Sequence, residues 1–345
     1  MGEEKKLNLT LIGCGGIADA HLRAVKVLEP RVELISTVDI DETRARAAAE
    51  KYEAAYWTTD YEKALSDEAV DAAILCLPHD LHAPVAIAAA EAGLHVLCEK
   101  PLSLNAAEGW QMVRRFEEAD RVLMVGHSRR FTPGAAQVRK IIQNGELGTV
   151  FHVHSSLLSY IQQASTAWRR RNESSGGYLI PIFGTHLIDL LLWVTDLVPL
   201  RVYCEYSSYR PEWEGDDEVS ITLALGDKEG REIPASVQMS ANCRMRPSRP
   251  QNRDELIVGG VDHTLIYNNP GRLFLDGDPL PLEPSEEAAL PTFARQLQEF
   301  VQAIDEGRAP VSSGHEAARV MEVLDAAQKS ATEHVVVELN RDDRK

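Results

Sequence analysis

The regular alternation of strand-like and helix-like segments in the first 125 residues constrains the fold of this chain more than any other feature. Short apolar runs typical of buried strands are separated by alanine-rich stretches typical of helices. The runs lie at residues 7–12, 32–39, 70–77, 95–98 and 121–125, and the clearest helical stretches at about residues 17–28, 41–52 and 82–92. Strands separated by helices of this length form βαβ units, so the region predicts an α/β fold with a doubly wound parallel sheet.

The pattern changes after Gly126. Longer strand-like stretches follow, at residues 151–156, 202–209, 219–225, 235–241 and 255–258. Turn sequences such as Asn268-Asn269-Pro270-Gly271 lie between or after them, and two helical stretches close the chain. We therefore predict two domains: a parallel α/β domain of residues 1–124, and an α+β domain of residues 125–345 with a large open, mostly antiparallel sheet.

Charge and composition disfavour several classes of function. The 345 residues include 53 acidic and 36 basic side chains, a net charge of −17 that opposes binding to nucleic acid or to anionic membranes. Five cysteines without a C-x-x-C pair are typical of reduced thiols in a cytosolic protein. The most apolar stretch, residues 179–200, contains His186, Asp189 and Asp196, which a spanning helix rarely carries, and the N-terminus lacks the pattern of a signal peptide. We expect a cytoplasmic protein with no nucleic-acid or membrane partner.

A glycine-rich turn follows the first strand directly and opens the first helix. Its sequence is Gly13-Cys14-Gly15-Gly16-Ile17-Ala18, a G-x-G-x-x-A pattern in which glycines allow a tight turn and a close approach of the backbone to a pyrophosphate at the helix N-terminus. Asp39 ends the next strand, where a carboxylate can accept hydrogen bonds from the ribose hydroxyls of a dinucleotide. Ile40 and Asp41 follow without a basic residue, so a 2′-phosphate would meet negative charge. These residues predict a Rossmann domain that binds NAD rather than NADP; the alternative is a plain strand–turn–helix in which Asp39 only caps.

Two further segments carry candidate catalytic side chains. Lys100 lies in Cys98-Glu99-Lys100-Pro101, at the carboxyl end of a parallel strand, where ligands of open α/β sheets bind. A lysine there can donate a hydrogen bond to a reacting oxygen, or it can be a solvated loop residue. His186 precedes Asp189 by one helical turn, and histidine exchanges protons readily near neutral pH. The alternative is a structural histidine that is bonded to Asp189.

Taken together, these motifs resemble the Gfo/Idh/MocA family of NAD(P)-dependent sugar and inositol oxidoreductases. Further segments that carry the resemblance are Leu77-Pro78-His79-Asp80-Leu81-His82, Glu99-Lys100-Pro101, Arg130-Phe131 with Pro133, Gly145-Glu146-Leu147-Gly148 and Trp168-Arg169. The resemblance implies hydride transfer between NAD(H) and a secondary alcohol or ketone of a sugar, cyclitol or related small molecule. It also implies assembly into a homodimer or homotetramer through the sheet of the second domain.

The resemblance assigns roles to particular residues. Lys100 and His186 would be catalytic. The cofactor would contact Gly13, Cys14, Gly15, Gly16, Ile17, Ala18, Asp39, Leu77, Pro78, His82, Glu99 and Lys100. The substrate would contact Trp168, Arg169, Ile182 and Asp189.

The chain departs from the family pattern at one position. Family sequences usually read G-G-x-x-x-D-x-G-x-H-x-x-D, and alignment on Gly184, His186 and Asp189 puts Ile182 where the middle aspartate belongs. An isoleucine cannot hydrogen-bond a substrate hydroxyl. Three interpretations stay open. Ile182 could form an apolar wall of the pocket for a different substrate. The protein could instead be an NAD-binding sensor with little hydride chemistry, or a glycoside hydrolase that uses NAD transiently.

Two groups of arginines and a pair of histidines are the remaining candidate ligand-binding residues. Arg169-Arg170-Arg171 and the set Arg244, Arg246 and Arg249 could bind a carboxylate or phosphate of the substrate, or could be solvated loops. His152 and His154 have no third ligand at a suggestive spacing, so we predict no metal site.

Overall fold

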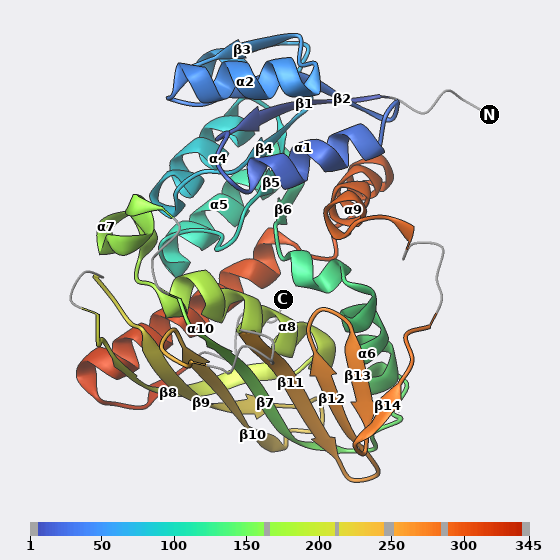
Figure 1. The fold of residues 1–345 in the computed structure, drawn as a ribbon, viewed down its shortest axis with the longest axis vertical. Coiled ribbons are helices and arrows are strands. Elements are labelled where there is room, and N and C mark those ends of the chain that lie inside the picture. Colours follow the sequence, from blue (N-terminus) through green and yellow to red (C-terminus); the bar gives the residue numbers. More distant parts are fainter. Residues whose placement is uncertain (1–5, 162–165, 211–213, 245–251, 284–288, 340–345) are drawn as a thin grey trace. The chain divides into compact units, whose positions relative to one another are not determined.

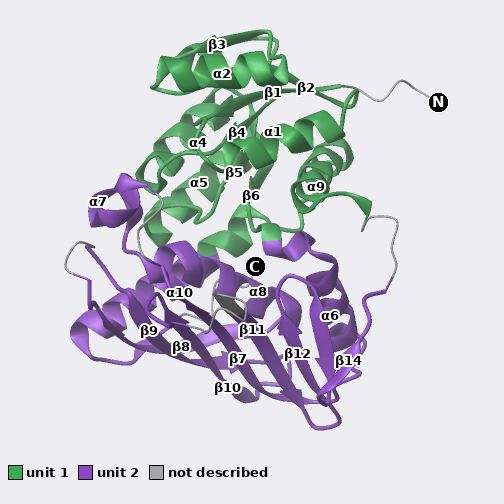
Figure 2. Cartoon of the chain, in the orientation of Figure 1, with its two compact units in different colours: residues 1–128, 289–318 green, residues 129–288, 319–345 purple. Residues whose placement is uncertain are grey.

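A computed structural model describes residues 6–161, 166–210, 214–244, 252–283 and 289–339 of the chain. The chain divides into two compact units (Figure 2): unit 1 comprises Met1–Ser128 and Ala289–Ala318, and unit 2 comprises Arg129–Ala288 and Arg319–Lys345. Each unit therefore contains two separate stretches of the sequence. The division into domains at residue 124 stays a prediction.

Unit 1 is built on a six-stranded parallel sheet with the order β3-β2-β1-β4-β5-β6 (Figure 1). The strands are β1 (Leu7–Ile12), β2 (Val32–Val38), β3 (Tyr56–Thr58), β4 (Ala72–Leu75), β5 (His95–Cys98) and β6 (Leu123–Val125). All five neighbouring pairs are parallel. The order reverses between β1 and β4, which is the switch point where open α/β sheets bind ligands. The predicted doubly wound sheet is thereby confirmed.

The helices of unit 1 follow from local sequence signals. They are α1 (Ala18–Val27), α2 (Glu42–Tyr52), α3 (Tyr61–Leu65), α4 (His82–Glu91), α5 (Ala106–Ala119) and α9 (Thr292–Glu306). Asp41 caps α2, because its side chain accepts hydrogen bonds from the backbone N–H groups of Thr43 and Arg44. The sequence did not predict that α9 would join this unit: the ring of Phe293 packs edge-on against His21 of α1, with 5.0 Å between centroids.

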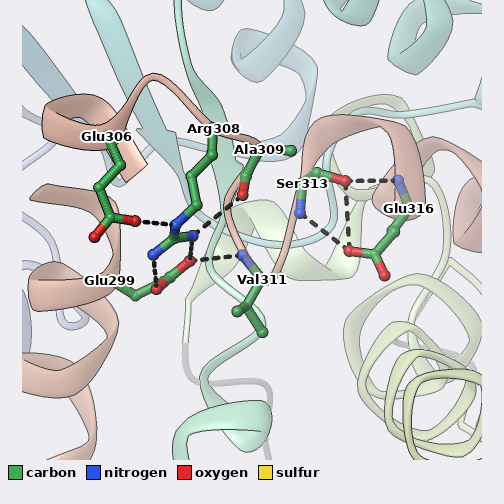
Figure 3. A network of polar contacts seen from close by, with 7 residues as sticks. All are labelled: Glu299, Glu306, Arg308, Ala309, Val311, Ser313 and Glu316. Atoms are coloured by element: carbon green, nitrogen blue, oxygen red, sulfur yellow. Dashed lines mark hydrogen bonds and ion pairs between the residues drawn. The ribbon is translucent and has the colours of Figure 1, made fainter. Parts of the chain in front are cut away.

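A polar network fastens the C-terminal stretch of unit 1 (Figure 3). Arg308 makes a bidentate ion pair with Glu299, with N–O distances of 2.6 and 2.9 Å. Glu299 also accepts a hydrogen bond from the backbone N–H of Val311 at 2.8 Å. The backbone N–H of Val125 donates to the carbonyl of Ser312 at 2.9 Å, and the Ser312 hydroxyl donates to the carbonyl of Val125. This stretch therefore pairs with the β6 edge of the sheet.

Unit 2 contains a nine-stranded sheet with the order β14-β13-β12-β11-β7-β10-β9-β8-β15. The strands are β7 (Val150–Ser159), β8 (Val198–Ser207), β9 (Glu218–Gly226), β10 (Glu232–Ser240), β11 (Asn252–Gly260), β12 (Thr264–Asn268), β13 (Arg272–Leu275), β14 (Asp278–Leu280) and β15 (Val337–Glu338). Neighbouring strands are antiparallel except for β7 and β10. The predicted large, mostly antiparallel sheet is confirmed.

Helices cover one face of this sheet. The helices α6 (Pro133–Gln143), α8 (Thr185–Thr195) and α10 (Gly314–Glu333) lie along it (Figure 1). Burial alternates along β9, where Val219, Ile221 and Leu223 are buried and the residues between them are exposed.

The stretch Asn172–Thr195 is long and apolar enough to cross a membrane, but 83% of its most apolar window is buried, as is usual for a core helix.

Candidate active site

The turn between β1 and α1 has the shape that a dinucleotide needs. Gly13 has a φ of +96°, and a Cβ there would lie 2.3 Å from the carbonyl oxygen of Cys76, so only glycine fits. A Cβ on Gly15 or Gly16 would instead meet no atom within 4 Å. No side chain caps the N-terminus of α1, and the partial positive charge of a helix N-terminus favours an anionic ligand.

Asp39 is fixed beside this turn. Its Oδ2 accepts the backbone N–H of Cys14 at 2.8 Å, and its Oδ1 accepts the backbone N–H of Asp41 at 2.9 Å. Each oxygen keeps a lone pair for a ribose hydroxyl. Arg44 is engaged by Asp41 at 3.3 Å, while Ile40 is 94% exposed. The close turn, the open space above it and the fixed carboxylate together fit an adenine dinucleotide.

The thiol of Cys14 stays protonated at this position. Burial, and then the charge of Asp39, raise its pKa to about 12. Cys14 therefore contributes its backbone N–H to the turn rather than a reactive thiolate.

His82 links the two loops that follow β4 and β5. It is fully buried, with Nδ1 at 2.7 Å from the carbonyl oxygen of Pro101 and Nε2 at 3.0 Å from that of Leu77. Burial lowers the pKa of the imidazole. The ring thus holds these loops together, and its contact with the cofactor stays a prediction.

Glu99 forms a buried pair with His21 next to Lys100. One carboxylate oxygen lies 2.8 Å from Nε2 of His21, and the other accepts the backbone N–H of Lys100 at 3.2 Å. Burial alone would raise the pKa of Glu99, but the hydrogen bond and charge of His21, together with Lys100, lower it below its usual range. A Cβ on Gly126 would lie only 2.9 Å from this carboxylate. The backbone of Lys100 is therefore held at the carboxyl end of β5.

A turn of wide, π-type helix precedes α8 and contains Ile182. This turn spans Ile180–Gly184, and such turns are frequent at functional sites. Ile182 is 3% exposed, and His186 lies in the first turn of α8 with a partly exposed side chain.

Asp216 anchors the beginning of this segment. Its carboxylate accepts the backbone N–H of Tyr178 at 3.0 Å and that of Ile180 at 2.7 Å. Burial raises the pKa of Asp216 to about 6, while these hydrogen bonds oppose the rise. Sequence patterns gave no signal for this residue, because the contact joins segments about 36 residues apart.

Asp189 pairs with Arg130, a residue to which the sequence assigned no role. The Nη2 of Arg130 lies 2.6 Å from Oδ1 of Asp189, and Nε lies 3.1 and 3.2 Å from the two oxygens. Both side chains are almost fully buried, at 2% and 1% exposure. Asp189 therefore fixes α8 to the residues before α6, and its contact with substrate stays a prediction.

The remaining predicted residues fall into two groups. Leu77, Pro78 and Lys100 are partly exposed and follow the strands of unit 1. Trp168 and Arg169 lie in a short helical turn of unit 2, with the guanidinium carbon of Arg169 5.3 Å from the Trp168 ring centroid. The pairing of Lys100 with His186 is a prediction.

The second set of predicted arginines and the possibility of a metal site are considered last. Arg246 and Arg249 lie outside the described residues, whereas Arg244 is described and exposed. Within the described part of the chain, no group of three or more His, Cys, Asp or Glu side chains could hold a metal ion.

Sequence profiles of one family match both halves of the chain. The profile of the oxidoreductase family with an NAD-binding Rossmann fold matches residues 7–127, and that of the GFO/IDH/MocA C-terminal domain matches residues 135–263. The chain belongs to the Gfo/Idh/MocA family. Its N-terminal part is an NAD-binding Rossmann fold.

Curated relatives include dehydrogenases for different substrates. Inositol 2-dehydrogenase of Salmonella typhimurium is 34% identical over 204 residues, 57% of each chain. The 4-carboxy-2-hydroxymuconate-6-semialdehyde dehydrogenase of Sphingobium sp. is 31% identical over 194 residues, 54% of this chain and 58% of the relative. These matches span just over half the length of each relative. D-xylose 1-dehydrogenase (NADP(+)) 2 of Haloferax volcanii is 27% identical, over 96% of this chain and 99% of its own length.

Solved structures share the fold over nearly the whole chain. An oxidoreductase domain protein from Kribbella flavida has a TM-score of 0.89 at 25% identity, covering 98% of this chain and all of its own. Levoglucosan dehydrogenase in complex with NADH and levoglucosan has a TM-score of 0.86 at 23% identity, covering 98% of this chain and 100% of its own. The second likeness shows the fold alone.

Proposed function

We propose that this protein is an NAD-dependent dehydrogenase that reversibly oxidises a secondary alcohol of a sugar, cyclitol or related small molecule. The observation that carries the proposal is the arrangement at the carboxyl ends of the unit 1 strands. There Gly13 makes the close turn after β1, Asp39 is fixed after β2, and Lys100 follows β5. Family membership and the dehydrogenases among its relatives support the same reaction class.

The chain's own residues would supply binding, charge stabilisation and proton transfer. The Lys100 ammonium would donate a hydrogen bond to the reacting oxygen and stabilise its developing negative charge. A ring nitrogen of His186 would accept the hydroxyl proton during oxidation and return it during reduction. The buried pair of Glu99 and His21 would hold the backbone from which Lys100 projects. When bound, the nicotinamide supplies the carbon that accepts the hydride.

Asp39 would select NAD over NADP. Its carboxylate would accept hydrogen bonds from the ribose hydroxyls and repel a 2′-phosphate. Arg44, a base close to this point, is engaged by Asp41.

The experiment that tests the function is a panel of polyols and sugars incubated with NAD, followed by the absorbance of reduced nicotinamide. Turnover of a member supports the dehydrogenase. A second candidate, an NAD-binding sensor, is favoured by Ile182, which is buried and cannot hydrogen-bond a hydroxyl. Tight NAD binding with no turnover on any member would favour the sensor.

We also propose a cytoplasmic homodimer or homotetramer that assembles through the sheet of unit 2. Large exposed side chains lie on or next to its strands, including Phe151 at 52%, Val261 at 65% and Tyr206 at 39% exposure. Apolar area of this kind favours burial against a second copy. Light scattering at micromolar concentration would contradict this if the mass were near the 38.2 kDa of one chain.

A further inference from the structure

We propose that two buried histidines, His21 and His82, are positioning residues that hold the backbone of Lys100 from both sides. His21 acts through the carboxylate of Glu99, and His82 acts through the carbonyl group of Pro101. We name these contacts the Lys100 clamp. The role requires neither histidine to contact the substrate. The inference rests on the proposed function, because it concerns how the lysine of that function is held in place.

The clamp joins three separate segments of unit 1. His21 lies on α1, and His82 is the first residue of α4; both side chains are buried. Lys100 lies on the loop that follows β5. Hydrogen bonds from two helices therefore fix this loop against the rest of the unit.

The first contact holds the N–H side of Lys100. One carboxylate oxygen of Glu99 lies 2.8 Å from Nε2 of His21, and the other accepts the backbone N–H of Lys100 at 3.2 Å. Nδ1 of His21 is buried and has no hydrogen-bond partner among the described residues, so we assign the ring proton to Nε2, which donates it to Glu99. This bond restricts rotation of the carboxylate and keeps its second oxygen directed at Lys100.

Packing around the pair of His21 and Glu99 restricts it further. The ring of Phe293, from α9, lies edge-on against His21, with 5.0 Å between centroids, and α9 runs beside α1 in Figure 1. A Cβ on Gly126 would lie 2.9 Å from the Glu99 carboxylate, so the glycine leaves the room that the carboxylate needs. Distant parts of the sequence thus determine where the N–H of Lys100 lies.

The second contact holds the loop one residue further along. Nδ1 of His82 lies 2.7 Å from the carbonyl oxygen of Pro101, and Nε2 lies 3.0 Å from that of Leu77. Burial lowers the pKa of the ring and so favours its neutral form, which has only one N–H to donate. The shorter contact assigns that proton to Nδ1. His82 therefore fixes the carbonyl group that follows Lys100.

Lys100 thus lies between two fixed peptide groups. Its own N–H is bonded to Glu99, and the next carbonyl group is bonded to His82. Lysine has a flexible four-carbon stem, so a fixed backbone limits the volume that its ammonium group can reach. A donor that stabilises developing charge has to be preorganised, and a displacement of about 1 Å can cost about 100-fold in rate. Loss of either contact should therefore lower kcat more than it changes NAD affinity.

Two substitutions at His21 separate its hydrogen bond from its packing. His21→Leu fills a similar volume without a donor and should lower kcat by about 10- to 100-fold. His21→Gln places an amide N–H near the position of Nε2 and should recover most of this loss. Both variants are assayed with saturating NAD on the best compound of the sugar and polyol panel, by the absorbance of reduced nicotinamide. Calorimetry measures their NAD affinity, which should change much less than kcat.

The equivalent substitutions at His82 test which ring nitrogen acts. The amide nitrogen of an asparagine falls near Nδ1 of a histidine, and that of a glutamine falls near Nε2. His82→Asn should therefore keep the bond to Pro101 and retain most of kcat. His82→Gln should lose this bond and lower kcat by about 10- to 100-fold.

His95 supplies the matched control. It lies at the opposite end of β5 from Lys100, where its Nδ1 accepts the backbone N–H of Val122 at 2.9 Å. His95→Ala removes a histidine hydrogen bond from the same sheet and should leave kcat close to that of the parent. The melting temperature of every variant reports its folding.

Hydrogen exchange at the amide of Lys100 reports its bond to Glu99 without any turnover. Exchange is measured on the full chain with NAD and read by mass spectrometry of short peptides. It should be faster in His21→Leu than in the parent. It should stay close to the parent rate in His21→Gln and His95→Ala.

The outcomes separate this inference from the proposed function. Parent-like kcat in both His21→Leu and His82→Gln would overturn the inference and leave the dehydrogenase intact. An equal loss of kcat in His21→Leu and His21→Gln, with an equal fall in melting temperature, would show a packing role and would also overturn it. Faster exchange at Lys100 in His21→Leu, with no turnover of any compound by the parent, would support the clamp and reject the dehydrogenase.

Discussion

Replacing Asp39 by alanine should weaken NAD binding and reverse part of the cofactor preference. The carboxylate oxygens are held by the backbone N–H groups of Cys14 and Asp41 at 2.8 and 2.9 Å, so they are preorganised for ribose hydroxyls. Losing one hydrogen bond to a charged acceptor costs about 1.5–3 kcal/mol, which corresponds to about 10- to 150-fold in NAD affinity. Water can reach both freed N–H groups, since this turn is partly exposed, so we expect little further loss.

The same substitution should improve NADP binding. Two unit charges about 4 Å apart repel by about 4 kcal/mol at an effective dielectric constant near 20, and less when solvent screens them. Removing Asp39 removes this repulsion of the 2′-phosphate. The ratio of NAD to NADP affinity should therefore fall by more than the NAD affinity itself.

Calorimetric titration with both cofactors measures these changes. Asp41→Ala is the matched control: it removes a neighbouring carboxylate that caps α2, at a cost of about 1 kcal/mol in stability, and should leave NAD affinity nearly unchanged. Equal or tighter binding of NADP to the parent protein would refute the reasoning, as would an unchanged affinity ratio in Asp39→Ala.

Three further predictions concern unit 2. Asp189→Ala should destabilise the protein by about 3–5 kcal/mol in urea unfolding, because it removes the carboxylate that pairs with the buried Arg130 guanidinium. Arg130→Met in the same chain should restore part of the loss, and a loss under about 1 kcal/mol would contradict this. Asp216 has a pKa of about 6 when folded, above its ordinary 3.8, so the folded protein holds this proton more tightly. Its stability contribution is complete below about pH 4 and is lost as the pH rises to about 6, by up to about 3 kcal/mol; Asp216→Asn should flatten the stability profile in that window, and an unchanged slope would count against it. Ile182→Asp should lower both the melting temperature and the activity on the native substrate, since it buries an unpaired carboxylate. If this variant instead gave strong activity on inositols in an otherwise inert protein, the parent would be a family member that lost its chemistry.

Local sequence signals explain why the fold of unit 1 and its dinucleotide motif could be predicted from the sequence. The close turn at Gly13 and the acceptor at Asp39 each depend on residues next to a strand end, and strand periodicity gave the sheet that positions them. The same motifs predict that Glu99 and His82 contact the cofactor, and these contacts stay predictions. A motif locates a loop but not the direction of each side chain, and both residues prove to be buried and bonded within the protein.

Contacts between segments that lie far apart in the sequence could not be predicted in this way. The pairing of Arg130 with Asp189 joins positions 59 residues apart, and the hold of Asp216 on Ile180 joins positions 36 apart. Such contacts depend on how the sheet of unit 2 registers and which helix covers it. The position of α9 in unit 1 has the same cause, because α9 packs against α1, a helix from the other end of the sequence.

The most direct test of the dehydrogenase is steady-state oxidation of the best compound from the sugar and polyol panel, followed by the absorbance of reduced nicotinamide. We predict turnover by the parent protein, a loss of about 10²–10³ in kcat for Lys100→Ala, and a loss of about 10²–10⁴ for His186→Ala with NAD affinity retained. Turnover that is unchanged in both variants would contradict the proposed roles of Lys100 and His186.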